Sequence, residues 1–292
     1  MLSPPEAHVQ WDGDIRDAQR FCEALARREA KNFYWGFISL PHDQRVAIYA
    51  LYGFARLVDD EADDPTRGDR EGRLDLQRER IRACAQGRYD DAVTQVLSDA
   101  MERYSIPEPE LQKLIDGVAM DLTKTRYATW GELQVYCDAV ASVVGRMCVR
   151  IFGFDDPIAL EHADELGLAL QLTNILRDVR EDASLGRIYL PSEDFERFGA
   201  SAEDLLSDEP GAWWEALVGF EVERAKSLFE GGYRVLAHVP RRSAACVQTM
   251  AGIYRRILTK IERDPRLPLR HRASLSSTEK FGVLVQSWLA GV

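Results

Sequence analysis

The chain has 292 residues, of which 46% are hydrophobic and 29% are charged, and its formal net charge is -11. This composition is typical of a soluble globular protein, is too apolar for a disordered one, and allows one large domain with a substantial core. The acidic balance argues against a nucleic-acid partner, because phosphate backbones are bound by an excess of Lys and Arg.

The cysteines and the terminal segments indicate in which cellular compartment the protein is expected. The 5 cysteines form no C-x-x-C pair, so neither a disulfide framework nor a zinc knuckle is indicated, and a cytoplasmic location fits best. The first residues show no signal-peptide pattern, and no window reaches the roughly 18 apolar residues of a membrane span. The apolar stretch at 281–292 either packs on the body or lies in a membrane interface behind the basic residues Arg266, Arg270, Arg272 and Lys280.

Apolar residues recur at helical spacing along almost the whole chain, and no run shows the period-2 alternation of a strand. The pattern therefore predicts an all-α protein. Glycine and proline breaks separate predicted helices at 14–35, 42–61, 71–87, 90–104, 108–123, 129–152, 157–182, 210–238 and 241–263. No change in composition marks a second domain, so residues 1–292 are expected to form a single domain, with a core at about 14–264 and a C-terminal segment, 265–292, of unassigned packing.

The helix predicted at 42–61 runs into a cluster of acids in the stretch LYGFARLVDDEADD. Residues four apart share a helical face, so Asp59 and Asp63 point the same way, with Tyr52 and Arg56 behind them, and Arg56 is expected to be buried there. Two carboxylates about 4 Å apart repel by about 4 kcal/mol at an effective dielectric constant of about 20. The cluster is either a hydrated helix end or a site for a divalent cation such as Mg²⁺; the positions required for an EF-hand are not met.

A second polar stripe lies in the helix predicted at 157–182. Gln171, Asn174, Asp178 and Asp182 follow one another at spacings that place them along one face. Two amides among leucines would cost roughly a few kcal/mol if they were left without partners, so the stripe indicates the wall of a polar site. Together, the two motifs predict an apolar cavity with a site for a metal and a diphosphate at its mouth.

Arginines flank this second stripe, and the guanidinium fork suits diphosphate oxygens. Arg177 and Arg187 are the candidates for this contact. The chain has neither G-x-G-x-x-G nor G-x-x-x-x-G-K-[ST], so phosphate is not expected to be bound by a glycine-rich loop.

Four blocks, in order, resemble the squalene/phytoene synthase family: NFYWGFISLP, AIYALYGFARLVDDEAD, YCDAVASVVG and QLTNILRDVREDASLGRIYLP, within about residues 29–264. The resemblance implies an isoprenoid-synthase fold, a helical bundle around a deep apolar cavity, and Mg²⁺-dependent head-to-head (1'-1) condensation of two prenyl diphosphates. The sequences of these motifs most resemble those of bacterial squalene-pathway members. This resemblance implies farnesyl diphosphate as substrate and presqualene diphosphate, squalene or dehydrosqualene as product. The alternative is a phytoene synthase that uses geranylgeranyl diphosphate. NADPH is an allowed reductant, lipid substrates allow peripheral membrane contact, and no obligate protein partner is evident.

The resemblance also assigns roles to residues. The implied magnesium ligands are Asp59, Asp63, Asn174, Asp178 and Asp182, and the implied diphosphate contacts are Tyr52, Arg56, Gln171 and Arg187, with Lys31 in the less typical stretch EAKN. The implied channel residues are Phe33, Tyr136, Val140 and Gly145, although core packing explains Phe33 and Val140 equally well. Tyr189 and Tyr254 match tyrosines near the reacting carbons, and together with Tyr52 and Arg56 they are the implied catalytic residues.

Other functions fit the pattern less well. A head-to-tail prenyltransferase or terpene cyclase also uses D-D-x-x-D, but NILRDVRED matches neither of the second motifs of those enzymes. A ferritin-like di-iron bundle needs Glu-x-x-His, and none of the 5 histidines has a Glu three residues before it. The non-enzymatic alternative is a helical binding protein whose acids serve solubility.

Overall fold

The computed structural model describes residues 13–30, 32–63, 68–206 and 210–289, and these are helical apart from their connections and one isolated parallel bridge between Arg126 and Ile188. The α-helices are α1 (Ile15–Glu29), α2 (Tyr34–Phe37), α3 (His42–Asp63), α4 (Arg70–Cys84), α5 (Ala92–Tyr104), α6 (Glu108–Met120), α7 (Trp130–Cys137), α8 (Val143–Phe152), α9 (Ile158–Ser184), α10 (Ser192–Arg197), α11 (Trp213–Gly232), α12 (Arg241–Arg263), α13 (Leu267–Arg270) and α14 (Ser277–Leu289). A π-helical turn, η2 (Asp138–Ser142), and two 3-10 helices, η3 (Ala202–Leu206) and η4 (Tyr233–Ala237), complete the order. The all-α prediction is confirmed.

The sequence predicted one continuous helix at 14–35, but the structure has two separate helices there, α1 and α2, so this prediction was wrong. The backbone of Ala30 leaves the helical region, with φ -80° and ψ 47°. The chain then turns so that α2 packs against α12, where a Cβ on Gly36 would lie 2.9 Å from the carbonyl oxygen of Cys246. Glycine therefore allows the close approach, and the contact between distant helices sets where the first helix ends.

The helix predicted at 129–152 contains a π turn, η2, which divides it into α7 and α8. Such turns insert one extra residue and shift the register of the side chains that follow. Behind η2, a Cβ on Gly167 of α9 would lie 2.6 Å from the Cα of Ser142. The helix predicted at 210–238 likewise begins later, at Trp213, and ends in η4.

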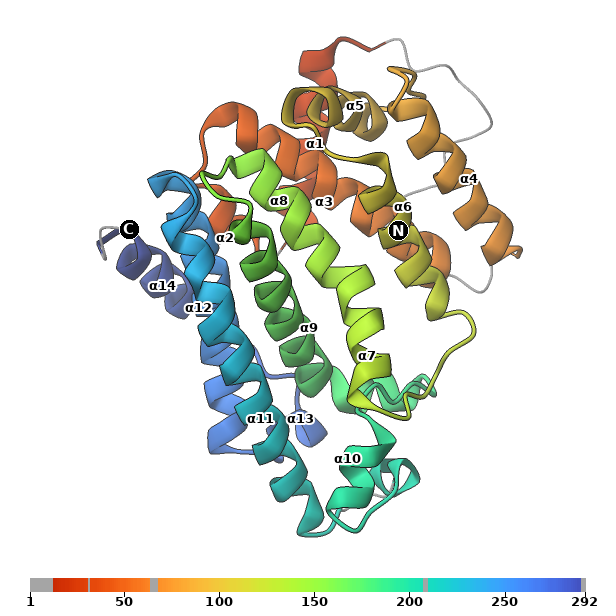
Figure 1. Ribbon diagram of the computed structural model, residues 1–292, viewed down its shortest axis with the longest axis vertical. Helices are drawn as coiled ribbons and strands as arrows, with labels where there is room; N and C mark the ends of the chain where they lie inside the picture. Colours follow the sequence, from red (N-terminus) through yellow and green to blue (C-terminus); the bar gives the residue numbers. More distant parts are fainter. Residues whose placement is uncertain (1–12, 31, 64–67, 207–209, 290–292) are drawn as a thin grey trace.

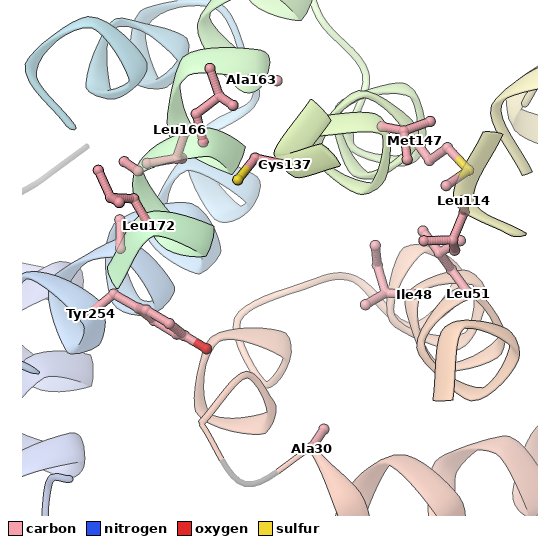
Figure 2. Packing of buried hydrophobic residues seen from close by; sticks show 14 of the residues in the cluster. Ala30, Ile48, Leu51, Leu114, Cys137, Met147, Ala163, Leu166, Leu172 and Tyr254 are labelled. Atoms are coloured by element: carbon pink, nitrogen blue, oxygen red, sulfur yellow. The ribbon is translucent and has the colours of Figure 1, made fainter. Parts of the chain in front are cut away.

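The helix α9 runs through the middle of the bundle and contacts α7, α8, α11, α12 and α13 (Figure 1). One hydrophobic cluster joins residues from Ala18 to Val283. Figure 2 shows its side chains reaching inward from different helices: Ile48 and Leu51 of α3, Leu114 of α6, Met147 of α8, Leu172 of α9 and Tyr254 of α12. The C-terminal segment packs on this body, α13 against α9 and α14 along α12.

Within the described ranges, no helix is both long enough and apolar enough to cross a membrane.

Candidate active site

The last turns of α3 carry the first acidic motif. Asp59 is half-buried and Asp63 is exposed. Burial raises the pKa of Asp59 to about 7; Arg56 opposes this shift, and the negative charge of Asp63 adds to it. A carboxyl group with so high a pKa is short of positive partners, because an ionised carboxylate that loses water needs a compensating charge.

Arg56 is not buried with these acids, contrary to the expectation from the sequence. Its side chain is 44% exposed, and Nη2 lies 2.6 Å from Oδ1 of Asp60. Residues three apart on a helix differ in direction by about 60°. This difference allows Asp59 to face inward while Arg56 lies at the solvent edge of the same helix.

The C-terminal half of α9 carries the second polar stripe. The Asn174 Nδ2 group donates to Oε1 of Gln171 over 3.2 Å, while the buried Oδ1 of Asn174 accepts no hydrogen bond from the described residues. Burial raises the pKa of Asp182 to about 7, and the charges of Asp178 and Glu181 raise it further. Asp182, like Asp59 on α3, therefore has no ion pair with a described residue.

Asp178 is the exception, because two arginines hold it. Arg177 donates from Nε to Oδ1 over 2.8 Å and from Nη2 to Oδ2 over 2.5 Å. Arg272, from the loop between α13 and α14, donates to the same two oxygens over 2.8 and 2.9 Å. No pattern in the sequence pairs Arg272 with a residue 94 positions earlier. The packing of the C-terminal segment on α9 brings the two residues together.

Arg187 links the two acidic helix ends. Its Nη1 lies 3.6 Å from Oδ1 of Asp63 on α3, and its charge also lowers the pKa of Asp182 on α9. The two motifs therefore face a common space. In the sequence they lie far apart, with 115 positions between Asp63 and Asp178. This juxtaposition is the one that the spacing of the acids predicted.

Asp121, at the C-terminal cap of α6, is a member of this group that the sequence analysis missed. It accepts hydrogen bonds of 2.9 Å from the hydroxyls of both Tyr136 and Tyr189. Burial raises the pKa of Asp121, the two tyrosine hydroxyls and Arg187 lower it, and Asp63 raises it. The available signal was an acid directly after an apolar helix, the same feature that marked the other two motifs.

Two aromatic groups border the acids. Tyr127, Tyr136 and Tyr189 have ring centroids 5.2 to 6.0 Å apart. On the other side, the rings of Phe33 and Tyr254 stack at 5.6 Å, and the guanidinium of Arg177 lies 6.0 Å from the centre of the Tyr254 ring. Aromatic faces next to charged groups can attract a cationic intermediate.

The remaining residues that the sequence predicted for the site lie in different environments. Tyr52 is half-buried on α3, and burial raises its pKa to about 12. Val140, in η2, is packed partly buried against the core. Gly145 lies where α8 crosses α9, and a Cβ there would be 2.8 Å from the carbonyl oxygen of Ala163, which gives this glycine a packing role. Lys31 lies outside the described residues.

The donor set fits magnesium. Among the described residues, no three His, Cys, Asp or Glu side chains are arranged to hold a metal ion by themselves. Magnesium commonly takes only one or two carboxylates and completes its shell with waters and substrate phosphates. The carboxyl oxygens of Asp59 and Asp182, whose pKa values are raised, and the unpaired Oδ1 of Asn174 are hard oxygen donors that such an ion would use.

Residues 26–279 match the family model for squalene/phytoene synthase. The phytoene synthase of Mycobacterium tuberculosis is 37% identical over 283 residues, covering 96% of this chain and 93% of the relative. Among solved structures, squalene synthase HpnC from Alicyclobacillus acidocaldarius has a TM-score of 0.81 at 31% identity, covering 85% of this chain and 94% of the other. A dehydrosqualene synthase bound to a ligand has a TM-score of 0.84 at 27% identity, covering 94% and 97%.

The all-helical bundle, which these structures match over most of its length, is an isoprenoid-synthase fold, and the protein is an enzyme of the prenyltransferase class. The chain belongs to the squalene/phytoene synthase family. The activity common to this family is the head-to-head condensation of prenyl diphosphates.

Proposed function

We propose that this enzyme joins two molecules of farnesyl diphosphate head to head and yields presqualene diphosphate and/or squalene or dehydrosqualene. The observation that carries the diphosphate chemistry of this proposal is the pairing of charges between the helix ends. Arg187 pairs with Asp63 on α3 and its charge lowers the pKa of Asp182 on α9, while Arg272 lies against Asp178. Carboxylates that could hold Mg²⁺ and guanidinium groups that could hold diphosphate oxygens thus meet at the edge of an apolar core.

Magnesium would be held by Asp59 and Asp63 on α3 and by Asn174, Asp178 and Asp182 on α9, and when bound it would neutralise charge on the diphosphates. The arginines have a related task. Arg56, Arg177, Arg187 and Arg272 can each donate hydrogen bonds to phosphate oxygens, whose negative charge increases as the bond between carbon C1 and oxygen breaks. Gln171 adds an amide to the same wall of the site.

The reaction that these residues would support has two ionisations. The C1–O bond of the donor breaks, the diphosphate keeps the electron pair, and the 2,3-double bond of the acceptor attacks the allylic cation. Loss of a proton closes a cyclopropane ring and gives a cyclopropylcarbinyl diphosphate. The second diphosphate then leaves, and the cation rearranges to the 1'-1 linear skeleton before it is quenched by hydride or by loss of a proton.

The tyrosines suit this chemistry because they remain protonated. Burial raises the pKa of Tyr52 to about 12 and raises the pKa values of Tyr136 and Tyr189 above the usual range. A phenolate would trap a carbocation covalently, whereas a neutral ring offers the negative face of its quadrupole. Tyr254 and Phe33 present such faces beside Arg177.

Two chain lengths are supported by different relatives. Farnesyl diphosphate is supported by the solved structures named squalene synthase and dehydrosqualene synthase, whose TM-scores are 0.81 and 0.84. The second candidate, formation of phytoene from two geranylgeranyl diphosphates, is supported by the relative named phytoene synthase at 37% identity.

Purified enzyme incubated with each substrate and Mg²⁺, with and without NADPH, separates these candidates. We expect a C30 product from farnesyl diphosphate, and phosphatase treatment followed by mass analysis identifies presqualene alcohol, squalene or dehydrosqualene by hydrogen and oxygen count. A C40 product from geranylgeranyl diphosphate, with none from farnesyl diphosphate, assigns phytoene synthesis instead. Absence of both products, together with no Mg²⁺-dependent release of diphosphate, contradicts the proposed activity.

Magnesium is expected to raise the melting temperature more at about pH 8 than at about pH 5.5, because it binds only ionised carboxylates. In the metal-free protein, the pKa values of Asp59 and Asp182 are raised to about 7. The folded state therefore holds protons that the unfolded state, with pKa values of about 4, releases earlier. The stability contributed by these protons is lost as the pH rises from about 4 to about 7, and above this window magnesium replaces them.

Differential scanning fluorimetry with MgCl₂ or EDTA at both pH values measures this effect. The variant Asp43→Asn, at the opposite end of α3, is the control and should retain the pH-dependent increment. An equal magnesium-induced shift at the two pH values would show that these carboxylates do not take the ion.

A further inference from the structure

The outer side of α14 carries a stripe of apolar side chains that the described part of the chain leaves largely exposed. Phe281, Val285, Trp288 and Leu289 occupy one helical face, and three of them have high exposure: 55% for Phe281, 54% for Trp288 and 80% for Leu289. Figure 1 shows α14 on the outside of the bundle, along α12. An apolar face of this kind on a surface helix marks an interaction surface.

The opposite face of α14 is what attaches the helix to the body. Val283 and Ser287 are buried, and a Cβ on Gly252 of α12 would lie 2.8 Å from Cγ1 of Val283. Arg256 of α12 donates to the carbonyl oxygen of Glu279 over 3.2 Å and to Oε1 of Gln286 over 2.5 Å. The orientation of α14 is thus set by α12, and the exposure of its apolar stripe is a consequence of that docking.

A small cavity with two arginines among its lining residues opens beside this stripe. It has a volume of about 120 Å³ and is lined by Ser39, Arg241, Arg242, Ala245, Ser287 and Trp288. Arg241 is the first residue of α12, whose N-cap is Pro240 and has no side-chain capping bond. The first turn of a helix leaves backbone N–H groups without intrahelical partners, and its dipole favours an anion there.

Ser39 and Arg242 form one wall of this cavity. Ser39 is fully buried, and its Oγ atom has no hydrogen-bond partner among the residues that the structure describes. Arg242 is fixed next to it, since its Nε donates to the carbonyl oxygen of Ser39 over 3.1 Å. This contact holds Arg242 at the wall of the cavity, next to the start of α12, where a guanidinium can pair with an anion.

We propose that α14 and this cavity form a membrane-docking surface, in which Phe281, Trp288 and Leu289 enter the lipid interface and the cavity takes the phosphate group of an anionic phospholipid. Charge complementarity supports this occupant: the chain as a whole carries a charge of -11, yet Arg241 and Arg242 lie beside the apolar stripe. Trp favours the level of the lipid headgroups, and a helix of this kind lies in the interface plane. A second copy of the chain suits the surface less well, because a two-fold interface would bring the arginines of both copies together.

Flotation of the full-length protein with vesicles tests this surface. We expect binding to vesicles of phosphatidylcholine with phosphatidylglycerol and at least tenfold weaker binding to phosphatidylcholine alone. Each basic residue near an anionic membrane contributes about fivefold to the affinity, so the charge reversal Arg241→Glu should weaken binding to the anionic vesicles at least tenfold. Trp288→Ser combined with Leu289→Ser should weaken binding to a similar extent.

Matched variants on other surfaces serve as controls. Arg234→Glu, on an exposed position of η4, makes the same charge change, and Leu76→Ser removes an exposed leucine from α4. Both should bind anionic vesicles as the unchanged protein does, and Arg241→Glu should retain full activity on detergent-dispersed substrate because its side chain is remote from the acids of α3 and α9. Inorganic phosphate at millimolar concentration should not displace the vesicles, since it lacks the apolar part of the contact.

Three results would overturn the proposal. The first is equal binding to neutral and anionic vesicles, and the second is unchanged binding of the Arg241 and Trp288 variants. The third is a concentration-dependent dimer, seen by sedimentation, that Trp288→Ser abolishes and vesicles do not compete with, which would assign the surface to a second copy. None of these outcomes depends on which prenyl diphosphate the enzyme uses.

Discussion

Replacing Asp182 by asparagine is expected to lower the rate of product formation by roughly 10²- to 10³-fold, the range found when one group that stabilises developing charge is removed. The metal-free variant should nevertheless be at least as stable as the unchanged protein. Burial raises the pKa of Asp182 to about 7, so its ionised form is unfavourable in the folded state until a cation arrives. Asparagine keeps the shape of the side chain and removes that unfavourable charge.

The matched control for this experiment is Glu181→Gln, one residue earlier on the exposed side of α9. It removes the same charge from the same turn but leaves the inward-facing oxygens in place, so we expect less than about a twofold change in rate. The measurements are steady-state rates at saturating Mg²⁺ and melting temperatures in EDTA. A marked loss of stability in Asp182→Asn without loss of activity would show that this carboxylate serves the fold and not the reaction.

Replacing Arg272 by glutamine is expected to lower the rate by about 10²-fold with little change in melting temperature. Arg272 makes two hydrogen bonds to Asp178, of 2.8 and 2.9 Å, yet its side chain is 57% exposed. An exposed ion pair contributes only about 0 to 1 kcal/mol to folding. We therefore expect Arg272 to contribute mainly to catalysis, by supplying a hydrogen-bond donor at the acidic end of α9.

Arg270→Gln is the control for Arg272→Gln, because Arg270 is exposed in the same segment and pairs with Asp264 instead. Arg272→Lys is informative too, since lysine keeps the charge but cannot make the bidentate contact. We expect Arg270→Gln to retain activity and Arg272→Lys to be intermediate. Equal losses in Arg270→Gln and Arg272→Gln would attribute the effect to the packing of the C-terminal segment.

The spacing of polar residues predicted the two walls of the site because that relation is local. Asp59 and Asp63 on α3, like Asp178 and Asp182 on α9, share a face whatever the rest of the chain does. Residues that reach the site through packing were missed. Asp121 belongs to it because α6 ends next to Tyr189, which lies 68 residues later.

The expected burial of Arg56 was wrong for a related reason. Periodicity says which residues share a face, but the position of neighbouring helices decides which edge of that face is open to water. On α3, the inner edge carries Asp59 and the outer edge carries Arg56 with Asp60.

The helical class, the helices that carry the acids and, through ordered motifs, the family can all be predicted from the amino-acid sequence. These properties depend on local spacing and on short stretches of chain, both of which can be recognised before the fold is known. Tertiary structure decided where α1 ends, how Arg272 meets Asp178, and that α14 leaves Trp288 exposed beside a cavity with two arginines among its lining residues. Each of these depends on contacts between segments far apart in the chain, which only the packing of the helices brings together.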